Sequence, residues 1–350
     1  MSSSTDATVA SVASGVTSPA SPLARQLAHG LIPAVPVPHR ANGSLDTAAQ
    51  EAYAAWMAKQ DIAGVAAWAH TGRGLHLSGE TATAVLSSWR RALTGGRVLI
   101  AGAGARPRSQ PGHPGVRVTP RPDPRGLTDF VIRATVAMAT EARDLGADAI
   151  LVYPPSLLAG LTDHDERFVE VHAALADVGL PVIAFVLYEA AGGCRYGASV
   201  LDRILALPHV VGIKVATLDS VITFQAVAAR VPAGKLLISG EDRYLGNSLM
   251  MGARSALIGM GAALTGLQAA LLAAHASGDA ERFVRLSAAC DRLGAAAFRD
   301  PVDGYIRRML WLLAVEGVIP REAAYDPWGP DVPEEQLEEV ERVAGDLRVS

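Results

Sequence analysis

Eight short runs of apolar residues recur along the chain, and segments with helical spacing of apolar side chains separate them. The runs are mostly continuous rather than alternating, which is typical of parallel strands covered on both faces. They comprise residues 31–37, 64–69, 97–103, 148–153, 181–188, 210–216, 235–240 and 255–260. Eight strand–helix units in about 250 residues predict an α/β fold, a (β/α)8 TIM barrel.

The intervening segments carry helix signals at their ends. Ser44 or Asp46 is placed to cap the first helix, and Gly146 and Gly179 follow two later ones. Two further helical runs follow the eighth unit, which predicts an appended C-terminal helical segment. We therefore divide the chain into a disordered Ser/Thr/Ala-rich tail (residues 1–25), a barrel (26–279) and the helical segment (280–350).

Two competing architectures fit the pattern less well. A doubly wound sheet would carry a dinucleotide fingerprint after the third strand, but Pro107 occupies its third glycine position. Residues 256–276 are long enough to span a membrane, but three glycines, Thr265 and Gln268 interrupt them. We interpret this stretch as a strand, a turn and a helix, and we expect no membrane span.

Composition narrows the class of protein further. The formal net charge of -4 gives no basic footprint for nucleic acid. The two cysteines do not make a disulfide framework, which predicts a reducing, cytoplasmic location, and no signal peptide is expected. Residues 105–126 are rich in proline and arginine and follow the third strand; they are either a functional loop at the barrel mouth or a mobile surface insertion.

Lys214 stands inside the apolar run 210–216 and is one of only three lysines, with Lys59 and Lys235. Burial disfavours the ammonium form and lowers the pKa of a lysine. The neutral amine attacks a ketone and forms a Schiff base, whose iminium is an electron sink for breaking or making a C–C bond. The alternative is a structural lysine, paired with an internal carboxylate or reaching solvent from the strand end.

Several motifs in a fixed order resemble the dihydrodipicolinate synthase / N-acetylneuraminate lyase family, the pyruvate-dependent class I aldolases. The similarity spans roughly residues 27–320 and includes "GVAAWAHTGRGLHLS", "GADAILVYPP", "VVGIKVAT" and "ISGEDRYLGNSLMMGARSALIG". The resemblance implies that Lys214 forms the imine and that Tyr188 relays protons. It also implies that Thr71, with the backbone around His70 and Gly72, holds the carboxylate of a 2-oxo acid.

The sequence departs from the family pattern at several positions. His70 replaces a hydroxyl residue, and Pro154-Pro155 replaces a tyrosine pair, which disfavours a true dihydrodipicolinate synthase. Arg195 lies near the sequence position at which some members of the family have an arginine that binds a second carboxylate. Ser239 and the acidic pair after it fall in a loop that contacts the acceptor in lyases, although Asp242 is also placed to cap the next helix.

The resemblance implies a class I aldolase or lyase that acts on pyruvate or a related 2-oxo acid, and an aldehyde as its partner substrate. We expect no cofactor beyond the lysine imine and no metal, because His164 and His172 lack metal-ligand spacing. A dehydratase that uses the same imine and a non-catalytic barrel that binds a keto acid remain alternatives. By analogy with the family we expect a homotetramer.

Overall fold

The computed structural model describes residues 20–106 and 123–349. Most of the predicted tail (residues 1–19) and of the Pro/Arg-rich loop (107–122) lies outside the described residues. The predicted tail boundary at residue 25 is wrong, because α1 (Pro22–Leu27) begins before it. The Ser21 hydroxyl accepts a hydrogen bond from the Ala24 N–H at 3.1 Å and caps this helix. Leu27 is fully buried and anchors it.

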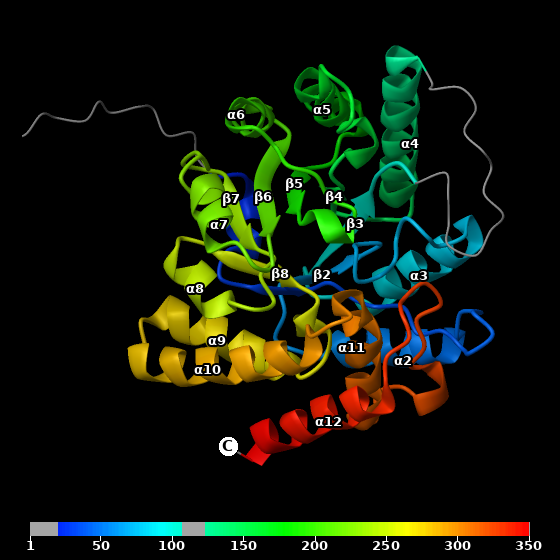
Figure 1. The fold of residues 1–350 in the computed structure, drawn as a ribbon, viewed down its shortest axis with the longest axis vertical. Coiled ribbons are helices and arrows are strands. Elements are labelled where there is room, and N and C mark those ends of the chain that lie inside the picture. Colours follow the sequence, from blue (N-terminus) through cyan, green and yellow to red (C-terminus); the bar gives the residue numbers. More distant parts are fainter. Residues whose placement is uncertain (1–19, 107–122, 350) are drawn as a thin grey trace, which may run out of the picture.

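A closed barrel of parallel strands forms the centre of the molecule (Figure 1). In the described part of the chain its strands are β1 (Leu31–Pro33), β2 (Gly64–Ala67), β3 (Val98–Ala103), β4 (Ala149–Val152), β5 (Val182–Leu187), β6 (Val210–Ala216), β7 (Leu236–Ser239) and β8 (Ser255–Ile258). The ladder runs β1-β8-β7-β6-β5-β4-β3-β2. The Val35 N–H donates to the Ala66 carbonyl at 3.1 Å and joins β1 to β2. The eight predicted strands and the TIM barrel are confirmed.

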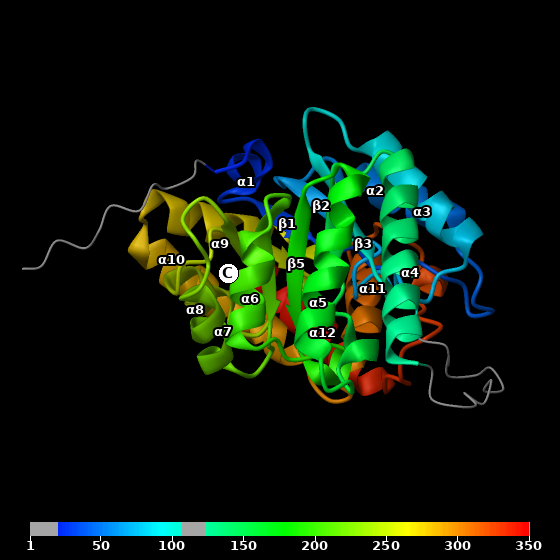
Figure 2. The ribbon, with the colours of Figure 1, turned by 90° about the horizontal axis from the view of Figure 1, so that it is seen from above.

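Helices cover the outside of the barrel, and Figure 2 shows α4, α5 and α6 side by side against the strands. The helices of the barrel part are α2 (Thr47–Met57), α3 (Gly79–Ala92), α4 (Pro124–Asp144), α5 (His164–Ala173), α6 (Ala198–Ala206), α7 (Val221–Ala228), α8 (Leu245–Met250) and α9 (Thr265–Ser277). Asp46 caps α2, because its carboxylate accepts from the Ala49 N–H. Gly146 and Gly179 both adopt positive φ after their helices, as predicted.

Buried side chains form two clusters, one inside the barrel and one between strands and helices. Every strand residue is buried, which explains why the strands are continuous apolar runs rather than alternating ones. Leu23 and Leu27 of α1 belong to the interior cluster. The same cluster includes Val98 and Leu236, the first residues of β3 and β7. The first helix therefore covers the N-terminal end of the barrel and leaves the C-terminal end for a site.

The predicted C-terminal helical segment is confirmed as α10 (Ala280–Ala297), α11 (Tyr305–Val315) and α12 (Glu334–Val349). Helix α10 packs on α8 and α9, and α12 packs on both α10 and α11. Helix α11 also contacts the 3-10 turn Met260–Ala262, which follows β8. The segment thus reaches the C-terminal mouth of the barrel. Within residues 20–106 and 123–349, no helix has both the length and the apolar character needed to cross a membrane.

Candidate active site

Lys214 lies on β6, two residues before the strand ends at Ala216. Its neighbours in the ladder are Phe185 on β5 and Ile238 on β7, and both belong to the interior cluster. The lysine therefore points into the barrel, as predicted, and is only 5% exposed. Burial lowers the pKa of its amine to about 8, although nearby carboxylates, Asp242 first among them, oppose the shift.

The Lys214 side chain opens onto a small cavity at the C-terminal ends of the strands, hereafter the inner cavity. Its volume of about 20 Å³ is room for roughly one water molecule. Six residues with polar side chains line it: His70, Thr71, Tyr188, Lys214, Asp242 and Tyr305. Four of these come from the sequence prediction, and the fold brings them together from β6 and from the loops after β2 and β5.

Tyr188 directly follows β5, and its backbone N–H donates to the carbonyl of Ala216 at the end of β6. This bond extends the β5–β6 ladder by one step and fixes the tyrosine beside the lysine strand. Burial and the negative charges of Asp303 and Asp242 raise the pKa of the Tyr188 phenol well above its ordinary value. The hydroxyl keeps its proton at neutral pH and is therefore a proton donor in the cavity.

Two acidic residues follow β7 and have different structural roles. The Asp242 carboxylate accepts a hydrogen bond from the Met260 N–H at 2.6 Å, so it does not cap α8 and that prediction is wrong. Burial raises the pKa of Asp242 to about 7, while the positive charge of Lys214 lowers it. Glu241 accepts from the N–H groups of Thr217 and Leu218 and holds the end of β6 in place.

The loop after β2 brings His70 and Thr71 into the inner cavity. Among residues 20–106 and 123–349, nothing accepts a hydrogen bond from the backbone N–H of either residue. Two free N–H groups beside a hydroxyl form a suitable cradle for a carboxylate. Burial lowers the pKa of His70 to about 4, so its imidazole is neutral at pH 7.

Gly72 shapes this loop rather than lining the cavity. Its N–H donates to the carbonyl of Ala69 at 3.0 Å, so it is not available to an anion. A Cβ at this position would lie 2.8 Å from the Val35 carbonyl oxygen, so only glycine fits without a backbone shift. The predicted contact between the Gly72 backbone and a carboxylate is therefore not supported, because its amide is part of the turn.

Ser239 and Arg195 do not reach the cavity. Ser239 is fully buried on the outer face of β7, where its hydroxyl accepts a hydrogen bond from Ser248 of α8 at 2.6 Å. The Arg195 side chain is 91% exposed and pairs with Glu189 at 2.9 Å. Both predicted substrate contacts are wrong, because strand alternation turns Ser239 outward and the irregular loop after β5 carries Arg195 to solvent.

Two residues of the site are not predicted by any pattern in the sequence. Tyr305 begins α11, and its hydroxyl lies 2.9 Å from Thr71 Oγ1 and 3.1 Å from His70 Nδ1. Arg73 is buried and makes two contacts to Asp326 through Nε and Nη2. Their partners lie more than 200 positions away in the chain, so local patterns do not point to them.

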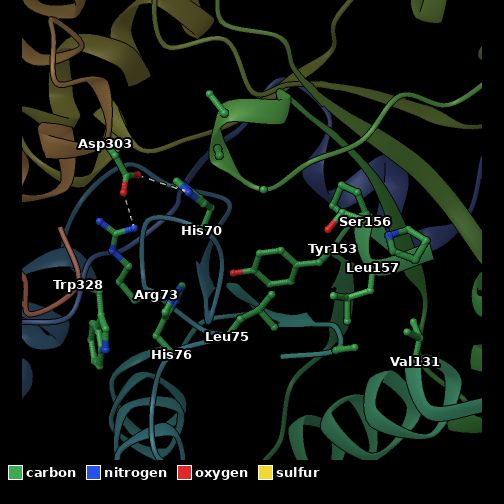
Figure 3. Close-up of a pocket in the computed structure, with 16 residues that line it drawn as sticks. His70, Arg73, Leu75, His76, Val131, Tyr153, Ser156, Leu157, Asp303 and Trp328 are labelled. Carbon is green, nitrogen blue, oxygen red and sulfur yellow. Dashed lines mark hydrogen bonds and ion pairs between the residues drawn. The ribbon is translucent and has the colours of Figure 1, made fainter. Parts of the chain in front are cut away.

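A larger cavity of about 300 Å³, hereafter the outer cavity, adjoins the inner one at His70. Figure 3 shows Asp303 paired with Arg73 and next to the neutral His70 on one side of it, and the apolar side chains of Leu157 and Val131 across from them. The apolar and aromatic part of its wall includes Leu75, Val131, Tyr153, Leu157 and Trp328. The outer cavity is therefore a vestibule with one charged wall and one apolar wall.

No cluster of three or more potential metal-ligating side chains occurs within the described ranges. His172 is buried on α5, and its Nδ1 lies 2.7 Å from the carbonyl oxygen of Phe168. His164 sits at the start of the same helix, with its Nδ1 2.7 Å from the Leu161 carbonyl. The two histidines thus make local backbone contacts.

The fold and the site define a class: a TIM barrel with a buried lysine of lowered pKa at the carboxyl ends of its strands, where barrels place their reactive groups. Comparison with known proteins agrees with this class. The chain belongs to the Dihydrodipicolinate synthetase family, whose family model matches residues 131–346. This match confirms the resemblance expected from the sequence.

Two curated proteins are similar in sequence. The probable mitochondrial 4-hydroxy-2-oxoglutarate aldolase of Emericella nidulans is 28% identical over 192 residues, which cover 53% of this chain and 54% of that protein. The L-threo-3-deoxy-hexylosonate aldolase of Aspergillus niger is 25% identical over 171 residues, 49% of this chain and 45% of that protein. The chain spans about half the length of the curated relatives it matches.

Solved structures share the fold over nearly the whole chain. A Ruminococcus gnavus sialic acid aldolase superposes with a TM-score of 0.75 at 17% identity, covering 93% of this chain and 99% of that one. An Acinetobacter baumannii dihydrodipicolinate synthase complexed with pyruvate superposes with a TM-score of 0.75 at 21% identity, covering 93% and 100%. An N-acetylneuraminate lyase from Mycoplasma synoviae gives 0.70 at 19%, covering 92% and 98%. At these identities the likeness concerns the fold.

Proposed function

We propose that the protein is a Schiff-base-forming class I aldolase or lyase that breaks or makes a C–C bond next to pyruvate or a related 2-oxo acid. The observation that carries the proposal is Lys214, buried at the barrel mouth with an amine pKa of about 8. At physiological pH roughly a tenth to a fifth of such an amine is neutral, far more than of an ordinary lysine, and this neutral form is nucleophilic. The family match and the aldolase names of the curated relatives support the same class.

The residues of the inner cavity suit the steps of this reaction. The Lys214 nitrogen adds to the ketone carbon while the carbonyl oxygen takes a proton from the Tyr188 hydroxyl. Loss of water then gives the iminium and forms the C=N bond. In cleavage, the deprotonated Tyr188 takes the proton of the C4 hydroxyl, the electron pair of the C3–C4 bond moves toward the iminium to give an enamine, and C4 leaves as the aldehyde. The enamine then takes a proton at C3, and water hydrolyses the resulting imine to release the 2-oxo acid and the Lys214 amine. Condensation follows the same steps in reverse, and the imine takes the place of a cofactor.

Each substrate has a place in this scheme. Thr71 and the free N–H groups of residues 70 and 71 receive the carboxylate of the 2-oxo acid. The outer cavity receives the aldehyde, because it adjoins the inner cavity at His70. The inner cavity has room for roughly one water molecule, so the 2-oxo acid must displace side chains as it binds. We propose that the half-buried Tyr188 side chain moves in that step, since it lines the cavity at the end of β5.

Borohydride reduction in the presence of pyruvate tests the proposal, because it converts the imine to a stable amine. We expect intact mass spectrometry to show one pyruvate-derived adduct and peptide mapping to place it on Lys214. Lys214→Arg is expected to fold and to give no adduct, because the guanidinium stays protonated. Lys59→Arg is the matched control, since Lys59 is exposed and far from the cavity lining. An adduct that persists in Lys214→Arg would overturn the assignment.

Product analysis with a panel of 2-oxo acids distinguishes the reaction types. Pyruvate plus an aldehyde indicates an aldolase, whereas a deoxy or unsaturated keto acid indicates a dehydratase. Reversible binding of pyruvate with no reducible adduct indicates a binding protein. By family analogy we also propose a homotetramer, which light scattering tests, and a cytoplasmic location, which the two free, buried cysteines support and cell fractionation tests.

A further inference from the structure

Tyr305 connects the appended helical segment to the loop that receives the carboxylate. It is the first residue of α11, outside the eight strand–helix units, yet its side chain is buried in the inner cavity. Its hydroxyl lies 2.9 Å from Thr71 Oγ1 and 3.1 Å from His70 Nδ1. In the described part of the chain, the backbone N–H groups of these two residues donate to no acceptor.

The ring of Tyr305 is held firmly in this position. It stacks on Phe298 with ring centroids 4.4 Å apart and planes 18° apart, and it lies nearly parallel to the His70 ring. Gly259 leaves the space for this arrangement. A Cβ on Gly259 would lie 2.8 Å from the Tyr305 ring and 3.0 Å from Thr71 Oγ1. The start of α11, the loop after β2 and the segment after β8 therefore meet here. The Tyr305 hydroxyl contacts both His70 and Thr71 as a result.

The hydrogen-bond capacities of these groups determine what Tyr305 does. A phenol has one O–H, so it donates to only one of its two neighbours. When Tyr305 donates to Thr71 Oγ1, the Thr71 proton points away from the phenol and is available to a carboxylate. In the His70 tautomer with the proton on Nδ1, His70 donates to the phenol oxygen. This order makes a directed chain from His70 through Tyr305 and Thr71 to the bound anion.

We propose that Tyr305 is a positioning residue for the carboxylate of the 2-oxo acid, holding the Thr71 hydroxyl in the orientation that donates to that anion. The appended C-terminal segment is therefore part of the substrate site rather than a cover of the barrel alone. The inference rests on the proposed function, since it concerns the ketone that forms an imine with Lys214.

Borohydride trapping with two ketones separates carboxylate binding from amine chemistry. Pyruvate carries the carboxylate and acetone does not, and both form reducible imines with a reactive lysine. For Tyr305→Phe, we expect the pyruvate concentration for half-maximal trapping to rise about tenfold, the loss typical of one hydrogen bond to a charged group. The acetone concentration for half-maximal trapping is expected to stay within twofold of wild type.

Tyr196→Phe is the matched control, because it removes the same hydroxyl from a half-buried tyrosine whose oxygen is buried. The Tyr196 oxygen has no hydrogen-bond partner within the described residues and lies outside both cavities. This variant is expected to trap both ketones like wild type. A second variant, His70→Asn, keeps an N–H donor near the position of Nδ1 and is expected to lose less pyruvate binding than His70→Leu.

The outcomes are distinguishable. If Tyr305→Phe traps pyruvate at wild-type concentrations, or if it loses acetone and pyruvate equally, the positioning role is overturned while the lysine chemistry stands. If the wild-type protein traps neither ketone, the proposed function itself is overturned, and this inference with it. An unchanged melting temperature of Tyr305→Phe shows that a selective loss of pyruvate trapping does not come from unfolding.

Discussion

The Lys214 amine lies over the face of the Phe185 ring, with Nζ 4.3 Å from the ring centroid. The two residues are direct neighbours in the β5–β6 ladder. The ring favours the ammonium form through a cation–π contact, whereas burial favours the neutral amine. Burial is the larger effect, since the pKa of Lys214 falls to about 8.

The rate of imine formation is therefore expected to rise with pH and to level off above a midpoint near 8. Below the midpoint the amine is protonated and has no lone pair to attack a ketone. Phe185→Leu removes the cation–π contact and is expected to move the midpoint lower by about 0.4–1.5 pH units, since such contacts contribute ~0.5–2 kcal/mol. Initial rates of borohydride trapping from pH 6 to 10 measure it. A midpoint near the ordinary lysine value would contradict the buried-amine account.

Asp242 is expected to affect the same midpoint in the same direction as Phe185. Its negative charge raises the pKa of Lys214, so Asp242→Asn should shift the trapping midpoint to lower pH. The asparagine carbonyl still accepts from the Met260 N–H, which keeps the loop in place. At pH 8, where the wild-type Asp242 carboxylate is mostly ionised, the variant should therefore trap acetone faster than wild type. A midpoint that rises or stays fixed would show that the two groups are not coupled.

The buried pair of Arg73 and Asp326 is expected to be important for stability. Asp326 is 7% exposed, and its carboxylate receives Nε and Nη2 of Arg73. Asp326→Asn leaves a buried guanidinium with one remaining carboxylate, which typically costs about 3–5 kcal/mol. The control is Asp202→Asn, which breaks an exposed pair with Arg230 and should cost less than about 1 kcal/mol. Urea unfolding compares the two; equal losses would contradict this account.

The sequence predicts the barrel well, because each parallel strand is buried on both faces and appears as a continuous apolar run. Lys214 is conspicuous for the same reason, as a charged residue in a run whose other side chains are apolar. Tyr188 directly follows β5, whereas Thr71 lies four positions after β2 ends. Both are found through short motifs that resemble the family, and each motif covers only a few neighbouring positions.

The site residues that the sequence predicted wrongly or did not predict have a different physical cause in common. Gly240 lines the inner cavity, and Ser239 is the residue before it. Strand alternation therefore turns Ser239 toward α8 instead of the cavity. Arg195 lies in a loop with no periodicity, so its direction is not encoded locally. Tyr305 and Arg73 depend on how the C-terminal helices dock on the barrel, which is a long-range packing result. Local sequence patterns do not predict such long-range contacts.

Gly240 is expected to be required for the position of the lysine. A Cβ there would lie 2.7 Å from Lys214 Cε and 2.8 Å from Ala216 Cβ. Gly240→Ala must therefore displace the amine and strain the strand end, at a cost of about 1–3 kcal/mol, and slow trapping at least ~10-fold. Gly266→Ala is the control, because nothing lies within 4 Å of its added Cβ and it sits in α9. Equal trapping rates in the two variants would contradict the close approach.

The charged wall of the outer cavity is expected to select the acceptor aldehyde. Arg73 is the guanidinium nearest the cavity, but Asp326 and Asp303 already receive its N–H groups. Burial lowers the pKa values of His70 and His76, so both are neutral at pH 7. The described wall therefore carries no net positive charge to bind a second carboxylate, while its other side is apolar and aromatic.

We therefore expect uncharged aldehydes with an apolar group to be better acceptors than aldehydes that carry a carboxylate. Burying an unpaired carboxylate beside Asp303 is costly, and a difference of at least ~10-fold in kcat/KM corresponds to about 1.4 kcal/mol. Condensation of pyruvate with benzaldehyde and with glyoxylate measures it. Asp303→Asn removes one negative charge and should improve glyoxylate use relative to benzaldehyde. A wild-type preference for glyoxylate, or no change in the variant, would show that Arg73 binds the acceptor despite its two partners.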